Sequence, residues 1–94
     1  MKRQHHFEIQ SETALREAMK IGTLIADLDH IVRTLNCDIA TEEERTRVFD
    51  RSDAKYSILA RTLATRGDNL THTIAALEQR LATIKAPLFE PVAA

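Results

Sequence analysis

The sequence contains little of what builds strands, tight turns or disulfide frameworks. Only two glycines and two prolines occur among 94 residues, aromatic residues make up 4%, and tryptophan is absent. This scarcity argues against a protein of short strands joined by tight turns. The single cysteine, Cys37, excludes an intramolecular disulfide framework and a zinc site made of cysteines.

An excess of charge of one sign is also missing. Thirteen Lys and Arg stand against fourteen Asp and Glu, which gives a formal net charge of −1. Nucleic acids and anionic membranes are bound through a basic excess or a basic stripe, so we expect neither as a partner. Nine of the thirteen basic residues are Arg, a bias typical of a GC-rich bacterial genome.

Long apolar runs are absent as well. No segment approaches the roughly 20 apolar residues of a membrane span. The N-terminal Met-Lys-Arg-Gln-His-His is not followed by the apolar stretch of a secretory signal. Together with the free cysteine, these features predict a cytoplasmic protein.

What the sequence does contain is aliphatic residues at helical spacing. Leu, Ile, Val and Phe account for 24 of the 94 residues, enough for a core. In the first part of the chain they recur every three or four positions, together with alanines: Ala14, Ala18, Ile21, Leu24 or Ile25, Leu28, Ile31 or Val32, and Leu35. This spacing puts one apolar stripe on a helix, which we place at about residues 8–36.

A turn and a second helix are predicted next. Residues 37–40 follow Asn36 and contain Asp38, and both residue types favour helix ends and turns. Thr41 with Glu44 three positions later forms a capping-box sequence, and the acidic residues 42–44 suit the positive end of a helix dipole. We therefore expect the turn at 37–40 and a second helix over about 41–85.

The second helix is predicted to be long because its apolar residues keep a seven-residue repeat. The repeat consists of Phe49, Tyr56, Leu63, Leu70, Leu77 and Ile84, with Leu59, Ile74 and Leu81 between them. Such a repeat is typical of a coiled-coil seam. The run Arg66-Gly67-Asp68-Asn69 resembles a helix stop, so a three-helix bundle broken at Gly67 is the alternative.

These elements predict an all-α fold, an antiparallel helical hairpin with a long second helix. With the turn at 37–40, Leu63 lies opposite Ala14 and Leu70 opposite Phe7. Leu77, Leu81 and Ile84 then have no partner in the first helix, although burying each is worth about 1.5–3 kcal/mol. We therefore expect a homodimer that forms a four-helix bundle. Its interface would contain Leu59, Leu63, Leu70, Ile74, Leu77, Leu81 and Ile84.

The C-terminal end is predicted to differ from the rest. Pro87 and Pro91 should end the helical domain, 1–86, and begin a tail, 87–94. Leu88 and Phe89 lie between the two prolines as an extended apolar segment, which suits docking into a groove. A short-lived regulatory protein would fit the small apolar end of this tail.

Residues that carry chemistry are few. His5, His6 and His72 come close together in the predicted register and are weak candidates for a Zn²⁺ or Ni²⁺ site. The seam is almost wholly apolar, whereas a catalytic bundle needs charged groups that converge on a cavity. We therefore expect a non-enzymatic interaction, adaptor or regulatory protein that binds an unknown protein partner and no cofactor. The alternative is a small helical enzyme or metal-binding bundle.

Overall fold

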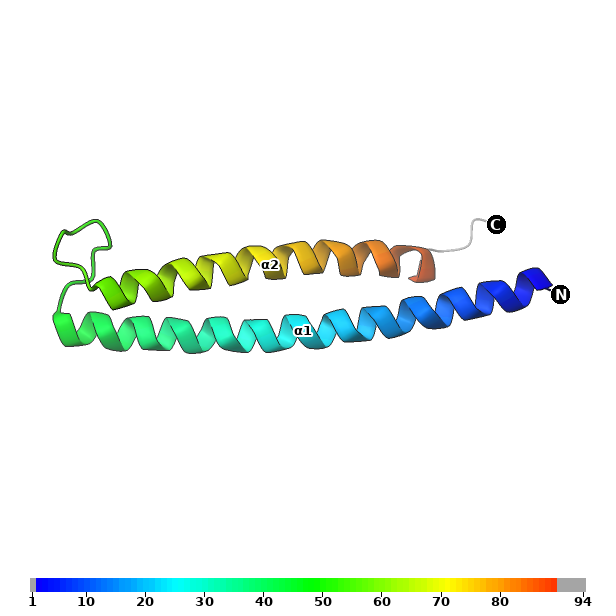
Figure 1. Cartoon of the computed structure of the whole chain (residues 1–94), viewed down its shortest axis with the longest axis horizontal. Helices are drawn as coiled ribbons and strands as arrows, with labels where there is room; N and C mark the ends of the chain where they lie inside the picture. The colour runs from blue at the N-terminus through cyan, green and yellow to red at the C-terminus, as the bar shows by residue number, and fades with distance from the viewer. Residues whose placement is uncertain (1, 90–94) are drawn as a thin grey trace.

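A computed structural model describes the backbone of residues 2–89 and the side chains of residues 11–87. It contains two helices, α1 (Lys2–Thr46) and α2 (Ile58–Phe89), joined by residues 47–57. The helices lie side by side and antiparallel over the whole length of α2, and α1 extends past its end (Figure 1). No strand occurs within residues 2–89. The all-α helical hairpin predicted from the sequence is therefore confirmed.

The predicted turn at 37–40 is wrong, because α1 continues through it without a break. Ile39 lies four residues after Leu35, and both are buried, so the apolar stripe of α1 simply continues. Thr41 does not cap a helix: its hydroxyl donates to the carbonyl of Cys37, one turn earlier, at 3.0 Å. A capping sequence does not start a helix where the preceding residues already extend one with a buried face.

The first helix ends instead at Thr46. Arg47 adopts a left-handed conformation, with φ of 62°, and its N–H donates to the carbonyl of Glu43 at 2.8 Å. This bond is the αL closure that satisfies one of the last helical carbonyls, here without a glycine. The sequence gives no warning of the ending, since neither glycine nor proline lies near it.

The connection 47–57 is held by its own aspartates. Asp50 accepts a bond from the N–H of Ser52 at 2.9 Å, and Asp53 accepts one from the N–H of Lys55 at 2.8 Å. The carbonyl of each aspartate also accepts a bond from an N–H three residues on, which makes two successive turns. Aspartates favour this geometry because a short carboxylate reaches the backbone two residues ahead.

The second helix begins after Ser57 and passes Gly67 unbroken. The hydroxyl of Ser57 accepts a bond from the N–H of Ala60 at 3.2 Å, which is an N-cap. Gly67 does not have a positive φ, so it does not act as a helix stop. The alternative of a three-helix bundle broken at Gly67 is therefore wrong.

Pro87 lies inside α2 rather than after it, so the predicted helix end at about residue 85 is also wrong. Proline removes one helical hydrogen bond and crowds the preceding turn. The last turn of α2 is accordingly angled away from the rest of the helix (Figure 1). Helical geometry thus continues to Phe89 in spite of the proline.

Side chains spaced three and four apart line the contact between the helices. The buried members are Ala18, Ile21, Leu35 and Ile39 on α1, Ala60 and Ala64 on α2, and Tyr56 just before α2. Near the open end of the hairpin, Leu81 lies across from Ala18 and Gly22. This register replaces the predicted one, which placed Leu81 beyond the end of its partner helix. We call this contact the seam.

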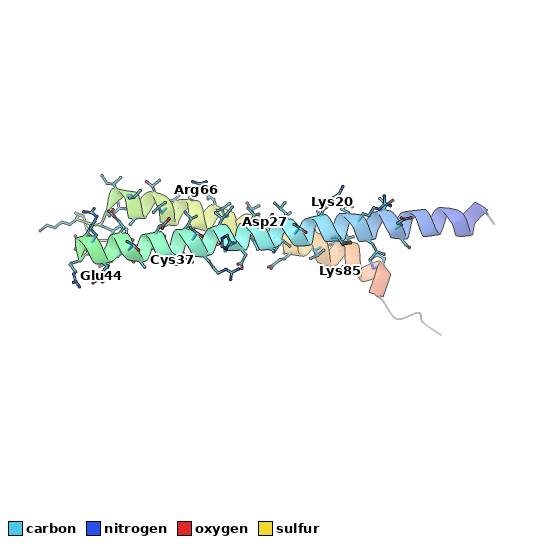
Figure 2. The ribbon with its side chains drawn as sticks, turned by 90° about the horizontal axis from the view of Figure 1, so that it is seen from below. Lys20, Asp27, Cys37, Glu44, Arg66 and Lys85 are labelled. Carbon is cyan, nitrogen blue, oxygen red and sulfur yellow. The ribbon has the colours of Figure 1, made fainter. Side chains whose placement is uncertain are left out.

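The hairpin is long and thin. Its dimensions are 68 × 22 × 14 Å, and its radius of gyration is 20.5 Å. A compact domain of this length has a radius of gyration of about 12 Å. Over residues 11–87, side chains project outward from both helices, among them Asp27 and Cys37 on α1 and Arg66 on α2 (Figure 2). Because the hairpin is a single layer of two helices, the other two sides of its seam are not covered by a helix of the same chain.

Candidate interaction surfaces

The residues predicted to form an interface divide into two groups. Six of them, Leu63, Leu70, Ile74, Leu77, Leu81 and Ile84, are half-buried at seam spacing on α2. Leu59 is different: it is 55% exposed, and the seam position beside it is taken by the fully buried Ala60. Ala60, and not Leu59, continues the alternation of four and three residues that runs from Tyr56 to Leu63.

A row of exposed apolar side chains runs along one side of the seam. Leu24 and Ile31 are 45% and 40% exposed, and Leu59 is 55% exposed. Leu24 follows Glu17 by seven residues, and Ile31 by fourteen, so the three share one side of α1. Glu17 is ion-paired with Arg80 of α2, so Arg80 lies on this side as well. Leu59 precedes Arg80 by 21 residues, or three heptads, and therefore lies on the same side of α2. We call this side of the hairpin the side face.

Charges on the side face are segregated by helix. On α1, Glu17 and Asp38 lie at the two ends of the apolar pair. On α2, Arg66 and Arg80 alternate with Leu59 and Thr73 at steps of seven residues. The α1 edge is thus acidic near its apolar residues, and the α2 edge is basic.

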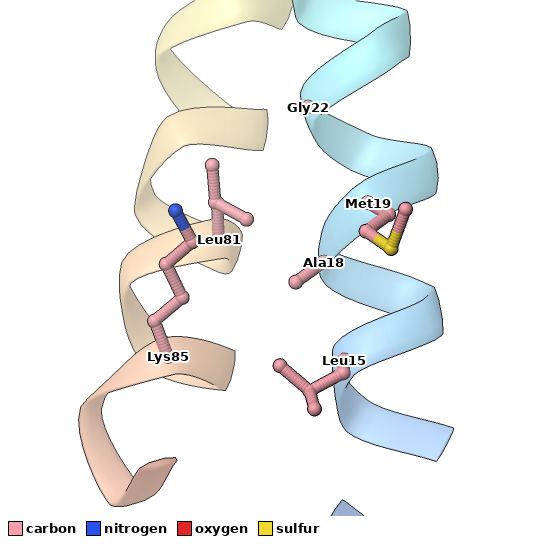
Figure 3. A pocket seen from close by; sticks show the side chains of 6 residues that line it. All are labelled: Leu15, Ala18, Met19, Gly22, Leu81 and Lys85. Carbon is pink, nitrogen blue, oxygen red and sulfur yellow. The ribbon is translucent and has the colours of Figure 1, made fainter. Parts of the chain in front are cut away.

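The opposite side of the seam has a hollow near the open end of the hairpin. Its volume is about 260 Å³, and its walls are Leu15, Ala18, Met19, Gly22, Leu81 and Lys85 (Figure 3). Gly22 helps to create the hollow, since a Cβ built there meets no atom within 4 Å. Leu15 on this side is 46% exposed. It matches Leu24 in exposure but lies on the other side of the seam.

The loop end of the hairpin is closed by hydrogen bonds between the loop and α1. The hydroxyl of Tyr56 donates to Glu43 at 3.0 Å, and that of Ser57 donates to Glu42 at 2.8 Å. Arg45 also donates to Glu42. The bonds from Arg45 and then Ser57 favour the ionised carboxylate, and they lower the pKa of Glu42 from 4.5 to about 2.

Tyr56 anchors the loop in the core. Its ring is 3% exposed and packs with Ile39, Ala60 and Ala64. Burial, and then the bond to Glu43, raise the pKa of Tyr56 above its ordinary value of 10.0. The guanidinium of Arg61 lies 5.8 Å from the ring centroid and donates to the loop carbonyl of Arg51 at 3.1 Å. The loop is therefore fixed from both helices.

Two further apolar residues are exposed at the loop end. Phe49 is 55% exposed and Ile58 is 84% exposed. Neither has the three-and-four spacing of the seam, so neither contributes to the hairpin core. Phe49 was expected to belong to the heptad seam, and that expectation is wrong because residue 49 lies in the loop rather than on a helix.

The observed helix register does not place His72 opposite His5 and His6, as the candidate metal site required. His72 lies in the middle of α2, and its Nδ1 is 2.8 Å from the carbonyl of Asp68. His5 and His6 lie near the start of α1, beyond the end of α2, and their side chains are outside the described residues. Within the described part of the chain, no three His, Cys, Asp or Glu side chains are arranged to hold a metal ion.

The predicted docking tail is only partly described. Leu88 and Phe89 form the end of α2 instead of an extended segment, and their side chains are outside the described residues. Residues 90–94 also lie outside them. Cys37 is exposed on α1.

Neither helix, over the described residues, has a stretch long and apolar enough to cross a lipid bilayer. Comparison of the chain with protein-family models, with curated proteins and with solved structures finds no match. The surfaces of the hairpin are therefore the basis for a functional proposal.

Some features of these surfaces were missed from the sequence although signals for them exist. Asp50-x-Ser52 and Asp53-x-Lys55 are both aspartate-led turn sequences, and Ser57 directly precedes an apolar helical run. These turn and cap sequences were overlooked because the heptad that includes Phe49 and Tyr56 placed the whole segment on one helix. The small buried residues of α2, Ala60 and Ala64, were also missed, since neither belongs to the heptad of large apolar residues.

Proposed function

We propose that this chain is a non-enzymatic helical interaction protein that acts through coiled-coil-type self-association and through binding of a protein partner. In this proposal two hairpins pair as a homodimer and form a four-helix bundle in the bacterial cytoplasm. The partner is a protein, and neither nucleic acid nor membrane is involved. This class of function uses surfaces rather than a catalytic cavity.

The excess of exposed surface is the observation that carries the proposal. The chain exposes 7638 Å². A compact monomer of 10.6 kDa exposes about 5,500 Å² by the usual scaling with mass. The excess is about 2,100 Å² per chain, and a stable protein–protein interface needs only about 800 Å² from each partner. The excess exposed area of one hairpin is therefore larger than the area that each partner buries in a typical dimer interface.

The composition of that surface supports the same proposal. Large apolar residues are exposed on α1, in the loop and at the start of α2: Leu15, Met19, Leu24, Ile31, Phe49, Ile58 and Leu59. The large seam residues of α2 are only half-buried. Since burial of a Leu or Ile is worth about 1.5–3 kcal/mol when complete, much of this stabilisation is still available to a second layer of helices.

Sedimentation equilibrium of the purified chain between 1 and 100 μM tests self-association. The proposal predicts a mass of twice 10.6 kDa at the upper concentration. A mass of one chain at every concentration would contradict it. Binding of a protein partner is tested by affinity capture from the native host with a variant that lacks residues 87–94 as comparison. If no protein is retained by the full chain, the partner-binding part of the proposal fails.

A further inference from the structure

The two sides of the seam differ in apolar content. On the side face, Leu24 and Ile31 of α1 are exposed large apolar residues seven positions apart, and Leu59 of α2 is a third. The opposite side has two exposed large apolar residues, Leu15 and Met19, both at the hollow near the open end of the hairpin, and none on α2 within the described residues. Its other members are Gly22, Asp29, Asn36 and Glu43 on α1 and Ser57, Ala64, Thr71, Glu78 and Lys85 on α2.

We propose that a second copy of this chain stacks on the side face, with α1 of one copy against α2 of the other. This inference rests on the self-association proposed above and adds to it the surface and the pairing of helices. Leu24 and Ile31 lie near the centre of the interface, and Leu59 lies at its end nearest the loop, level with Asp38. The hollow beside Gly22 stays on the outside of the bundle.

Charge complementarity selects the pairing of helices. Glu17 and Asp38 make the α1 edge of the side face acidic, and Arg66 and Arg80 make the α2 edge basic. Stacking α1 on the same helix of the second copy would bring like charges together, which is unfavourable. A two-fold arrangement that stacks α1 on α2 places Glu17 of each copy level with Arg80 of the other, and Asp38 of each copy one heptad from Arg66 of the other.

The size of the uncovered surface favours a second copy as the occupant. A two-fold interface uses the same patch twice, so three large apolar residues become six. The side face runs through the middle of the hairpin, between the levels of Glu17 and Asp38, which are 21 residues apart on α1. At 1.5 Å per residue this is about 32 Å, long enough for an interface of standard size.

Leu24→Asp and Leu15→Asp form a matched pair that tests the inference. The two leucines are 45% and 46% exposed, so both substitutions are tolerated equally by a lone hairpin. Sedimentation equilibrium should show that Leu24→Asp raises the dimer dissociation constant at least tenfold. Leu15→Asp should change it less than threefold. Circular dichroism of each variant checks that the helices remain.

Thiol labelling is a second test, and its cysteine substitutions disturb the interface less than the aspartate substitutions do. Ile31→Cys and Leu15→Cys are each made in a Cys37→Ser background and treated with a small thiol reagent at 100 μM protein. Ile31 and Leu15 have similar exposure in one hairpin, so a monomer predicts similar rates. Stacking on the side face predicts that the cysteine at 31 reacts at least tenfold more slowly than the one at 15.

Reversal of one charge tests the pairing of helices. Asp38→Arg places a basic residue against the basic edge of the second copy and should raise the dissociation constant threefold or more. Asp29→Arg on the opposite side is the control and should leave it unchanged. If Asp38→Arg leaves or strengthens the dimer, α1 does not stack on α2.

The outcomes separate this inference from the self-association itself. A wild-type chain that is monomeric at 100 μM overturns both. A dimer that is broken by Leu15→Asp, or in which the cysteine at 15 is the protected one, overturns the side face while self-association stands. A dimer that resists both aspartate substitutions, with equal thiol rates, also overturns the side face.

Discussion

Replacement of Gly67 by alanine should stabilise the protein. Gly67 lies in the interior of α2, where glycine is about 1 kcal/mol less favourable than alanine. Its φ is not positive, and a Cβ built on it meets no atom within 4 Å, although the residue itself is buried in the seam. Neither the backbone nor the packing therefore requires a glycine. We expect Gly67→Ala to raise the free energy of unfolding by about 0.5–1 kcal/mol.

Urea denaturation followed by circular dichroism at 222 nm measures this change. The midpoint should rise with the slope unchanged, and the thermal midpoint should rise by about 2–8 °C. Gly22→Ala is a companion variant on α1, again with no atom within 4 Å of the added Cβ. The effects of the two should add, since the sites do not share a contact. A loss of stability in Gly67→Ala would mean that α2 is broken there, as in a three-helix bundle, and would refute the continuous helix.

The remaining predictions concern the loop end. Ser57→Ala should lower the free energy of unfolding by about 1 kcal/mol through the lost N-cap, whereas Thr41→Ala, inside α1, should change it by less than about 0.3 kcal/mol; equal effects in urea denaturation would contradict the helix bounds. Tyr56→Phe should cost about 1 kcal/mol, since it leaves Glu43 without its donor, and a neutral result would show that this bond is not formed. Because the pKa of Glu42 is about 2 in the folded chain against 4.5 ordinarily, its contribution to stability is present above about pH 4.5 and is lost as pH falls toward 2. Acid titration of Glu42→Gln should show a weaker loss over this window, and an unchanged profile would contradict the assigned bonds.

The helical content and pairing of this fold were predictable because long apolar stripes leave few alternatives. The stripe of α1 from Ala14 to Leu35 and that of α2 from Leu63 to Ile84 were both recognised, and both lie on helices. Seven-residue spacing determines a helix face whatever the connection. The antiparallel hairpin followed from the presence of two such stripes in one short chain.

The connection was not predicted, because two local signals competed with longer-range packing. Thr41 to Glu44 has the sequence of a helix start, but Ile39 and Tyr56 bury their side chains together, and this packing keeps the chain helical past residue 41. The true end at Thr46 is closed by Arg47 in a conformation that usually belongs to glycine. Propensity cannot indicate such an ending.

The displaced turn also changes the argument for self-association. The sequence argument depended on Leu77, Leu81 and Ile84 having no partner in the first helix. In the structure Leu81 lies across from Ala18, so that argument no longer holds. What remains is a different observation, the exposed row of Leu24, Ile31 and Leu59 beside a half-covered seam. Leu24 and Ile31 were seen in the sequence only as alternatives to their seam neighbours.

The dependence of thermal unfolding on protein concentration tests most directly whether a second hairpin completes this fold. For a chain that is stable mainly as a dimer, a hundredfold increase in concentration from 1 to 100 μM adds about 2.7 kcal/mol of apparent stability. The midpoint should then rise by several degrees across this range. A midpoint that stays constant would show that the single hairpin is the stable unit, and it would contradict the proposed four-helix bundle.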